Sequence, residues 1–147
     1  MTFRVFSQLP ELSPVRLVQA ATRFFEASLE VLAQPSDGVL RLRISSARLG
    51  FSADFAVETR PKTPEDQAAA ARAELNGRSG GMAALCERCA HVWCVEASDG
   101  GTALYNLCAI LASVALGPVL PPDDSALFGV RGAMERVERL SGRSLSR

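Results

Sequence analysis

The residue types best suited to chemistry lie together in the middle of the chain. Cys86, Cys89, His91 and Cys94 fall within nine residues, and the whole sequence contains four cysteines and one histidine. Thiolates and imidazole nitrogens are the usual ligands of a tetrahedral zinc ion. A thiol close to an imidazole can also act as a nucleophile or a redox group. These four residues are therefore the candidate metal ligands and the candidate thiol-redox centre.

The placement of the thiols favours packing over chemistry. Cys86 and Cys89 share one face of a predicted helix with Leu85, where an apolar residue is expected. A free cysteine packs there as a small apolar side chain. His91 and Cys94 are three positions apart, so a regular strand directs them to opposite faces. We therefore predict no catalytic residue, no metal and no cofactor, and keep a Cys/His metal-binding or thiol-redox protein as the alternative function.

The balance of charges indicates which partners the chain can attract, and the excess of arginine over lysine indicates the kind of genome that encodes it. The 147 residues carry 16 basic and 16 acidic side chains, so the formal net charge is zero. No overall field attracts a polyanion, and we expect no nucleic-acid binding. Lys62 is the only lysine, against fifteen arginines, while alanine, leucine and glycine are plentiful. This bias is typical of a high-GC bacterial genome.

The N-terminal segment and the most apolar stretch of the sequence indicate where in the cell the protein is expected. The first residues contain no basic stretch followed by an apolar run and a small-residue cleavage site. The stretch 103–116 contains Asn106 and is shorter than the roughly 20 residues that a membrane helix needs. We therefore expect a cytoplasmic protein with reduced thiols and no membrane contact.

Side-chain periodicity predicts an alternation of strands and helices. Two-residue alternation and β-branched or aromatic content predict strands at 3–6, 40–45, 51–58 and 91–96. Three- and four-residue spacing predicts helices at 14–32, 64–76, 82–89, 103–116 and 127–140. Proline and glycine predict turns at 35–38 and 99–101. The second and third strands are expected to form a hairpin on which arginines face carboxylates.

This order of elements predicts the fold class. A βαββαβ order is that of a ferredoxin-like α+β sandwich, in which helices cover one face of a four-stranded antiparallel sheet. Two additional helices follow at the C-terminal end. The length suits one domain, which we place at 1–142, followed by a frayed tail at 143–147.

The solvent face of this sheet is the candidate partner-binding surface. It would display Arg41, Arg43, Asp54 and Glu58, together with Trp93 unless the apolar helix that starts at Thr102 covers this side of the sheet. Arginine and tryptophan often dominate the binding energy of protein interfaces. The sequence thus predicts a small cytoplasmic bacterial interaction module without catalytic activity, such as an adaptor, a regulatory subunit or an immunity-type protein. Its partner would be another protein or a second copy of the chain.

A third function class remains open beside the interaction module and the metal or redox protein. A small ligand can bind between helix and sheet without leaving a sequence motif, because shape makes such a pocket.

Overall fold

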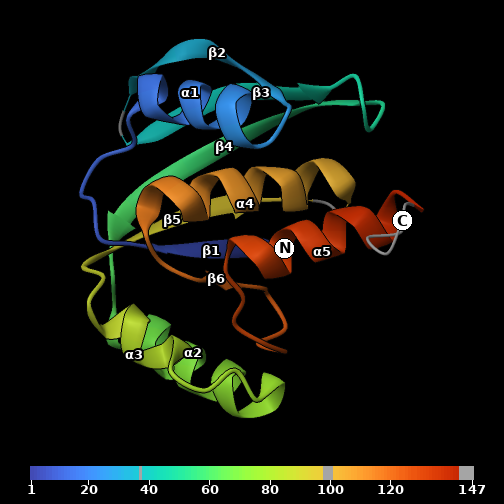
Figure 1. The fold of residues 1–147 in the computed structure, drawn as a ribbon. Coiled ribbons are helices and arrows are strands. Elements are labelled where there is room, and N and C mark those ends of the chain that lie inside the picture. The colour runs from blue at the N-terminus through green and yellow to red at the C-terminus, as the bar shows by residue number, and fades with distance from the viewer. Residues whose placement is uncertain (37, 98–100, 143–147) are drawn as a thin grey trace.

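The computed structural model describes residues 1–36, 38–97 and 101–142. The predicted turns at 35–38 and 99–101 include residues outside this set, and the predicted frayed tail at 143–147 lies entirely outside it. The described residues form an α+β structure (Figure 1). In chain order the elements are β1 (Thr2–Ser7), α1 (Pro14–Phe24), β2 (Ser28–Ser36), β3 (Val39–Ser46), β4 (Phe51–Pro61), α2 (Pro64–Gly77), α3 (Met82–Glu87), β5 (His91–Glu96), α4 (Thr102–Ala115), β6 (Val119–Leu120) and α5 (Val130–Leu140).

One open antiparallel sheet organises these elements, in the strand order β2-β3-β4-β5-β1-β6. The α+β class predicted from the sequence is confirmed. A ferredoxin-like arrangement is not confirmed, because the sheet has six strands where the prediction has four. The predicted hairpin is present as β3 and β4, which pair along their length from Val39↔Glu58 to Ser46↔Phe51.

The prediction of one long N-terminal helix over 14–32 is wrong. Helix α1 ends at Phe24, and Glu26 then takes a left-handed backbone conformation, with φ +50°. From there the chain runs as β2, in which Leu29 pairs with Ile44 of β3. Leu29 is buried and Leu32 is exposed, whereas a continuous helix would place these two residues, three positions apart, on the same face. Pairing with β3 therefore decides the conformation of this segment.

Alternation along the strands gives the sheet two covered faces. The first, which we call the α4 face, carries Val5 and Trp93 in one apolar core with residues of α1, α4 and α5. The second, the α2 face, carries Phe6 and Val92 in a separate core with α2 and α3. Figure 1 shows α1, α4 and α5 together on one side, and α2 and α3 away from them. Helices on both faces replace the one-sided layer expected from the sequence.

Helix α2 shows how local chemistry sets this packing. Pro64 starts the helix after Thr63, whose hydroxyl accepts a hydrogen bond from the Asp66 amide in a capping box. The side chains that α2 buries against the sheet are Asp66 and three alanines. The three alanines belong to the apolar core that also contains Phe6 of β1 and Val92 of β5, and the helix contacts β6.

A helix that crosses a membrane needs roughly 20 predominantly apolar residues. Within residues 1–36, 38–97 and 101–142, no helix is long and apolar enough to do so.

Candidate partner-binding surface

Helices α2 and α3 cover only part of the α2 face. The apolar core beneath them takes Phe6 from β1, Val92 from β5 and Leu120 from β6. Within the described part of the chain, this core contains no residue of β2, β3 or β4. The α2 face of β2, of β3 and of β4 as far as Glu58 is therefore open, and its alternate side chains form the surface that we call the sheet patch. Arg60, nearer the end of β4, lies outside the sheet patch because it bonds to Asp66 of α2. The charged members of the sheet patch are Glu30, Arg41, Arg43, Asp54 and Glu58, all exposed.

One row of the sheet patch carries alternating charge across three strands. Register places Arg43 of β3 opposite Glu30 of β2 on one side and Asp54 of β4 on the other. Arg43 donates from Nε to Asp54 Oδ1 at 2.7 Å and from Nη2 to Oδ2 at 3.2 Å. These hydrogen bonds raise the pKa of Arg43 and lower the pKa of Asp54. Both groups stay charged at neutral pH, so the row presents fixed charge of both signs.

Among the residues that the structure describes, Arg41 of the sheet patch has no carboxylate partner. Its neighbours across the sheet are Ala33 on β2 and Ala56 on β4. Within the described residues, no carboxylate lies within 4.0 Å of its guanidinium, and none of the cations reaches the Glu58 carboxylate on the next row. Methyl neighbours cannot accept hydrogen bonds, so the five N–H donors of Arg41 remain available to a partner.

The outer edge of β2 is less suited to binding than the face. Its pairing with β3 shifts register between Val31 and Ala33 and again between Ala33 and Ser36. Such irregularities on an edge strand hinder the addition of another strand. Docking through the face is therefore favoured over extension of the sheet.

Trp93 does not belong to the sheet patch. Its side chain is 0% exposed and lies on the α4 face, in the same apolar core as Leu107 and Leu111 of α4. Helix α4, which starts at Thr102, packs over Trp93 on the face of the sheet opposite the sheet patch. The sequence had left the position of this helix open. Of the five predicted partner-binding residues, Arg41, Arg43, Asp54 and Glu58 share the open surface, and Trp93 is packed on the opposite side of the sheet.

Two of the candidate metal ligands, Cys86 and Cys89, are buried together beneath α2 and α3. Burial raises the pKa of the Cys86 thiol to about 12 and also raises that of Cys89. The nearby cation is Lys62, which donates to the Cys86 carbonyl oxygen at 2.7 Å and to Gln67 Oε1 at 3.0 Å. At neutral pH both sulfurs are therefore protonated and poorly suited to attack or to metal binding.

The other two candidates are divided between the faces of the sheet. Register opposite Arg4 and Ser7 of β1 places Cys94 on the α2 face and His91 on the α4 face. Burial raises the pKa of Cys94 more than neighbouring Arg60 lowers it. In the described part of the chain, no group of three or more His, Cys, Asp or Glu side chains is placed to hold a metal ion.

The most developed polar cluster surrounds Asp66, which sequence reasoning assigned only to a helix cap. Asp66 is 1% exposed and accepts from Arg4 Nη1 at 2.9 Å and from Arg60 Nη1 and Nη2 at 2.6 and 2.8 Å. Burial alone would raise the pKa of Asp66, but bonds from Arg60, Thr63 and Arg4 hold it well below its usual range. The cluster fixes the start of α2 to β1 and β4. The sequence signal for it was Arg4, a charged residue between Phe3 and Val5, which are both buried.

A hollow of about 300 Å³ bears on the small-ligand alternative. It is lined by Pro10, Glu11, Leu12, Gly38, Val39, Leu40 and Thr59. Glu11 is the one charged residue among them, and none is a cysteine or histidine. The hollow could therefore enclose a small ligand, but its lining provides few polar or charged groups to orient one.

Comparisons of the chain with models of protein families, with curated proteins and with solved structures found no match.

Proposed function

We propose that the chain is a protein-interaction module without catalytic activity, which binds a partner protein through the sheet patch. The observation that carries the proposal is the open α2 face of β2, β3 and β4, which displays charges of both signs on hydrogen-bonded strands. Side chains on a paired sheet lose little backbone freedom on binding, which lowers the entropic cost of association.

The charge pattern favours a protein over a polyanion as the partner. Three carboxylates, Glu30, Asp54 and Glu58, stand beside two guanidiniums, Arg41 and Arg43. A nucleic acid would meet repulsion from the carboxylates, whereas a protein surface can present both signs. Arg41 is the expected main contact, because it can form a two-pronged ion pair with a partner carboxylate without giving up an existing bond.

Several biological roles are compatible with such a surface. An adaptor, a regulatory subunit or an immunity-type protein of the bacterial cytoplasm would each use a small, charge-balanced binding domain. A second copy of the chain is also a suitable partner, since a two-fold axis could place Arg41 of one copy against Glu58 of the other. The arginine-rich, lysine-poor composition supports this bacterial assignment. The raised pKa of the buried thiols Cys86 and Cys89 supports binding over redox turnover.

The test compares two charge reversals at exposed arginines. Tagged protein is used to recover partners from cells of its source, with wild type, Arg41→Glu and the control Arg131→Glu in parallel. Arg131 is exposed on α5, away from the sheet patch. A specific partner, or a dimer seen by light scattering, should be lost with Arg41→Glu and kept with Arg131→Glu. Equal recovery with both variants, or an enzymatic turnover abolished by one side-chain substitution, would contradict the proposal.

A further inference from the structure

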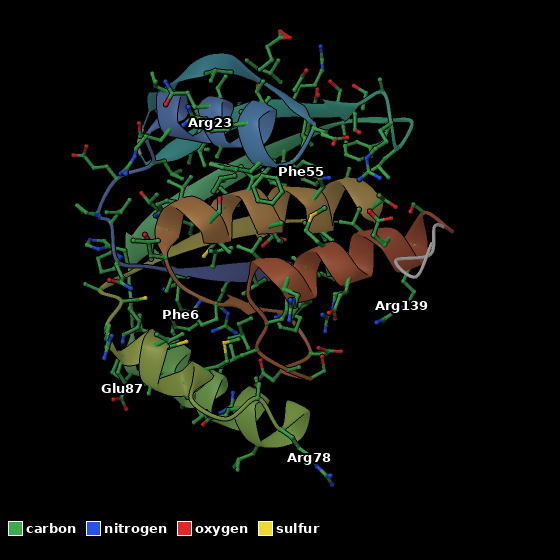
Figure 2. All side chains as sticks on the ribbon, viewed as in Figure 1. Phe6, Arg23, Phe55, Arg78, Glu87 and Arg139 are labelled. Carbon is green, nitrogen blue, oxygen red and sulfur yellow. The ribbon has the colours of Figure 1, made fainter. Side chains whose placement is uncertain are left out.

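A second surface lies between α1 and α4, on the outer side of the helical layer. A hollow of about 240 Å³ opens there, lined by Arg16, Gln19, Ala20, Arg23, Phe24, Ser113, Val114 and Leu116. The two helices contact each other directly, and Figure 2 shows Arg23 on α1. This surface, which we call the α1–α4 groove, lies across the sheet from the sheet patch.

The α1–α4 groove has a positive charge that the chain does not balance locally. Helix α1 carries Arg16 and Arg23 and no carboxylate, and α4 carries no charged side chain at all. The two helices thus contribute two positive and no negative charges, in a chain whose formal net charge is zero. Both arginines are exposed, and in the described residues neither lies within 4.0 Å of a carboxylate. A partner that carries negative charge would complement this surface.

Large apolar side chains line the same groove and remain in water. Phe24 is 69% exposed and Leu116 is 58% exposed. Leaving such side chains in water forgoes the stabilisation that burial would give. The guanidinium carbon of Arg23 lies 5.9 Å from the centre of the Phe24 ring, so charge and apolar surface are adjacent.

The backbone conformation of Leu116 is a second, independent observation that points to binding at the groove. It follows the last residue of α4 in a left-handed conformation, with φ +61°. Glycine is the residue usually found at this helix-ending position, because a side chain is strained there. A strained and exposed leucine helps neither the backbone nor the core. Residues held in sparsely populated conformations often lie at binding sites.

We propose that the α1–α4 groove binds an acidic amphipathic segment of a protein partner. An apolar side chain of that segment packs against Phe24 and Leu116, and its carboxylates pair with Arg16 and Arg23. This is a helix-in-groove or extended-peptide contact of the kind that combines apolar anchors with flanking charge. The proposal is independent of the sheet patch, which lies on the other side of the core.

The test uses three synthetic peptides of about 15 residues with one fixed pattern of leucine and phenylalanine at helical spacing. The flanking positions are glutamate in the first, lysine in the second and glutamine in the third. Each is titrated into ¹⁵N-labelled full-length protein. The acidic peptide should shift amides of α1 and of the C-terminal half of α4, and should bind at least ten times more tightly than the basic peptide. Binding of the acidic peptide should weaken as salt is raised.

Three variants assign the effect to this surface. Arg16→Glu/Arg23→Glu should reverse the preference in favour of the basic peptide. Leu116→Gly should weaken binding of the acidic peptide at least fivefold while raising the melting temperature, because it removes strain together with an apolar contact. A loss of folding therefore cannot account for its effect. Arg131→Glu, at an exposed position of α5 outside the groove, should leave peptide binding unchanged.

Four outcomes would overturn the proposal. They are no binding of the acidic peptide, equal binding of the acidic and basic peptides, amide shifts confined to the sheet patch, and unchanged affinity in Leu116→Gly.

Discussion

Removal of the Asp66 carboxylate tests how the start of α2 is held to the sheet. In Asp66→Ala, Arg4 and Arg60 lose their shared partner and Thr63 loses the reciprocal half of the capping box. Loss of a cap costs about 0.5–2 kcal/mol, and removal of one member of a buried ion pair costs about 3–5 kcal/mol. The stranded arginines are 19% and 34% exposed and can turn toward water, so the ion-pair loss falls below that range. We expect the free energy of unfolding to fall by about 2–4 kcal/mol.

Chemical denaturation with urea measures this change, and thermal unfolding gives a second estimate. For a chain of this size, a loss of about 2–4 kcal/mol corresponds to a melting temperature lower by roughly 4–16 °C. Asp54→Asn is the matched control, because Asp54 also accepts two bonds from an arginine but is 54% exposed. That substitution should leave the unfolding midpoint nearly unchanged. Equal effects of Asp66→Ala and Asp54→Asn would refute the argument that burial makes the Asp66 cluster important.

The pH dependence gives the same cluster a second signature. The folded-state pKa of Asp66 is depressed, so its contribution to stability is present above the unfolded-state pKa of about 4. It is lost as the pH falls below that value toward the folded-state pKa. The stability difference between wild type and Asp66→Asn should therefore be constant from about pH 5 to 8 and shrink below about pH 4. A difference that grew on acidification would contradict the assigned sign.

Two further predictions concern a close approach and the thiols. A Cβ on Gly117 would lie 2.0 Å from the Phe6 carbonyl oxygen, so Gly117→Ala should lower the free energy of unfolding, measured with urea, by roughly 2–4 kcal/mol. Gly80→Ala is the control, because a Cβ at Gly80 has no atom within 4 Å, and it should be nearly neutral. Equal effects of the two substitutions would show that the chain relieves the contact at Gly117 without cost. Burial raises the pKa of both Cys86 and Cys108 to about 12, so neither should react with a thiol-specific disulfide reagent at pH 8 until the protein is unfolded. Rapid labelling of either in the native state, mapped by mass spectrometry, would revive the redox alternative.

Local chemistry allowed prediction of the parts of the fold that depend on neighbours in sequence. The capping box at Thr63 and Asp66 marks the start of α2, and strict alternation marks β3 and β4. The prediction that arginines face carboxylates across this hairpin holds for Arg43 and Asp54 but not for Arg41, which faces Ala56, nor for Glu58, which faces Val39. In each case the signal is a short-range spacing, which the rest of the fold does not alter.

The parts that were missed depend on contacts distant in sequence. Strand β2 has apolar residues that fit a helical stripe equally well, and only pairing with β3 selects the extended form. Strand β6 has two residues and is defined by pairing with β1. Alternation also places Trp93 opposite Cys94 without saying which face a helix covers. The side on which α4 returns decides that Trp93 is buried.

The positions of the two proposed surfaces help to choose among the roles proposed for this chain. Arg41 and Arg43 alternate along β3 with Leu40 and Leu42, whose side chains belong to the core beneath α1 and α4. The sheet patch and the α1–α4 groove therefore lie on opposite sides of the same strands, and a partner on one does not occupy the other. Their chemistry also differs, since the sheet patch carries both signs and the groove combines positive charge with exposed apolar side chains. A domain with two separate and chemically distinct surfaces can hold two proteins at once, and this arrangement favours an adaptor over an inhibitor that blocks a single target.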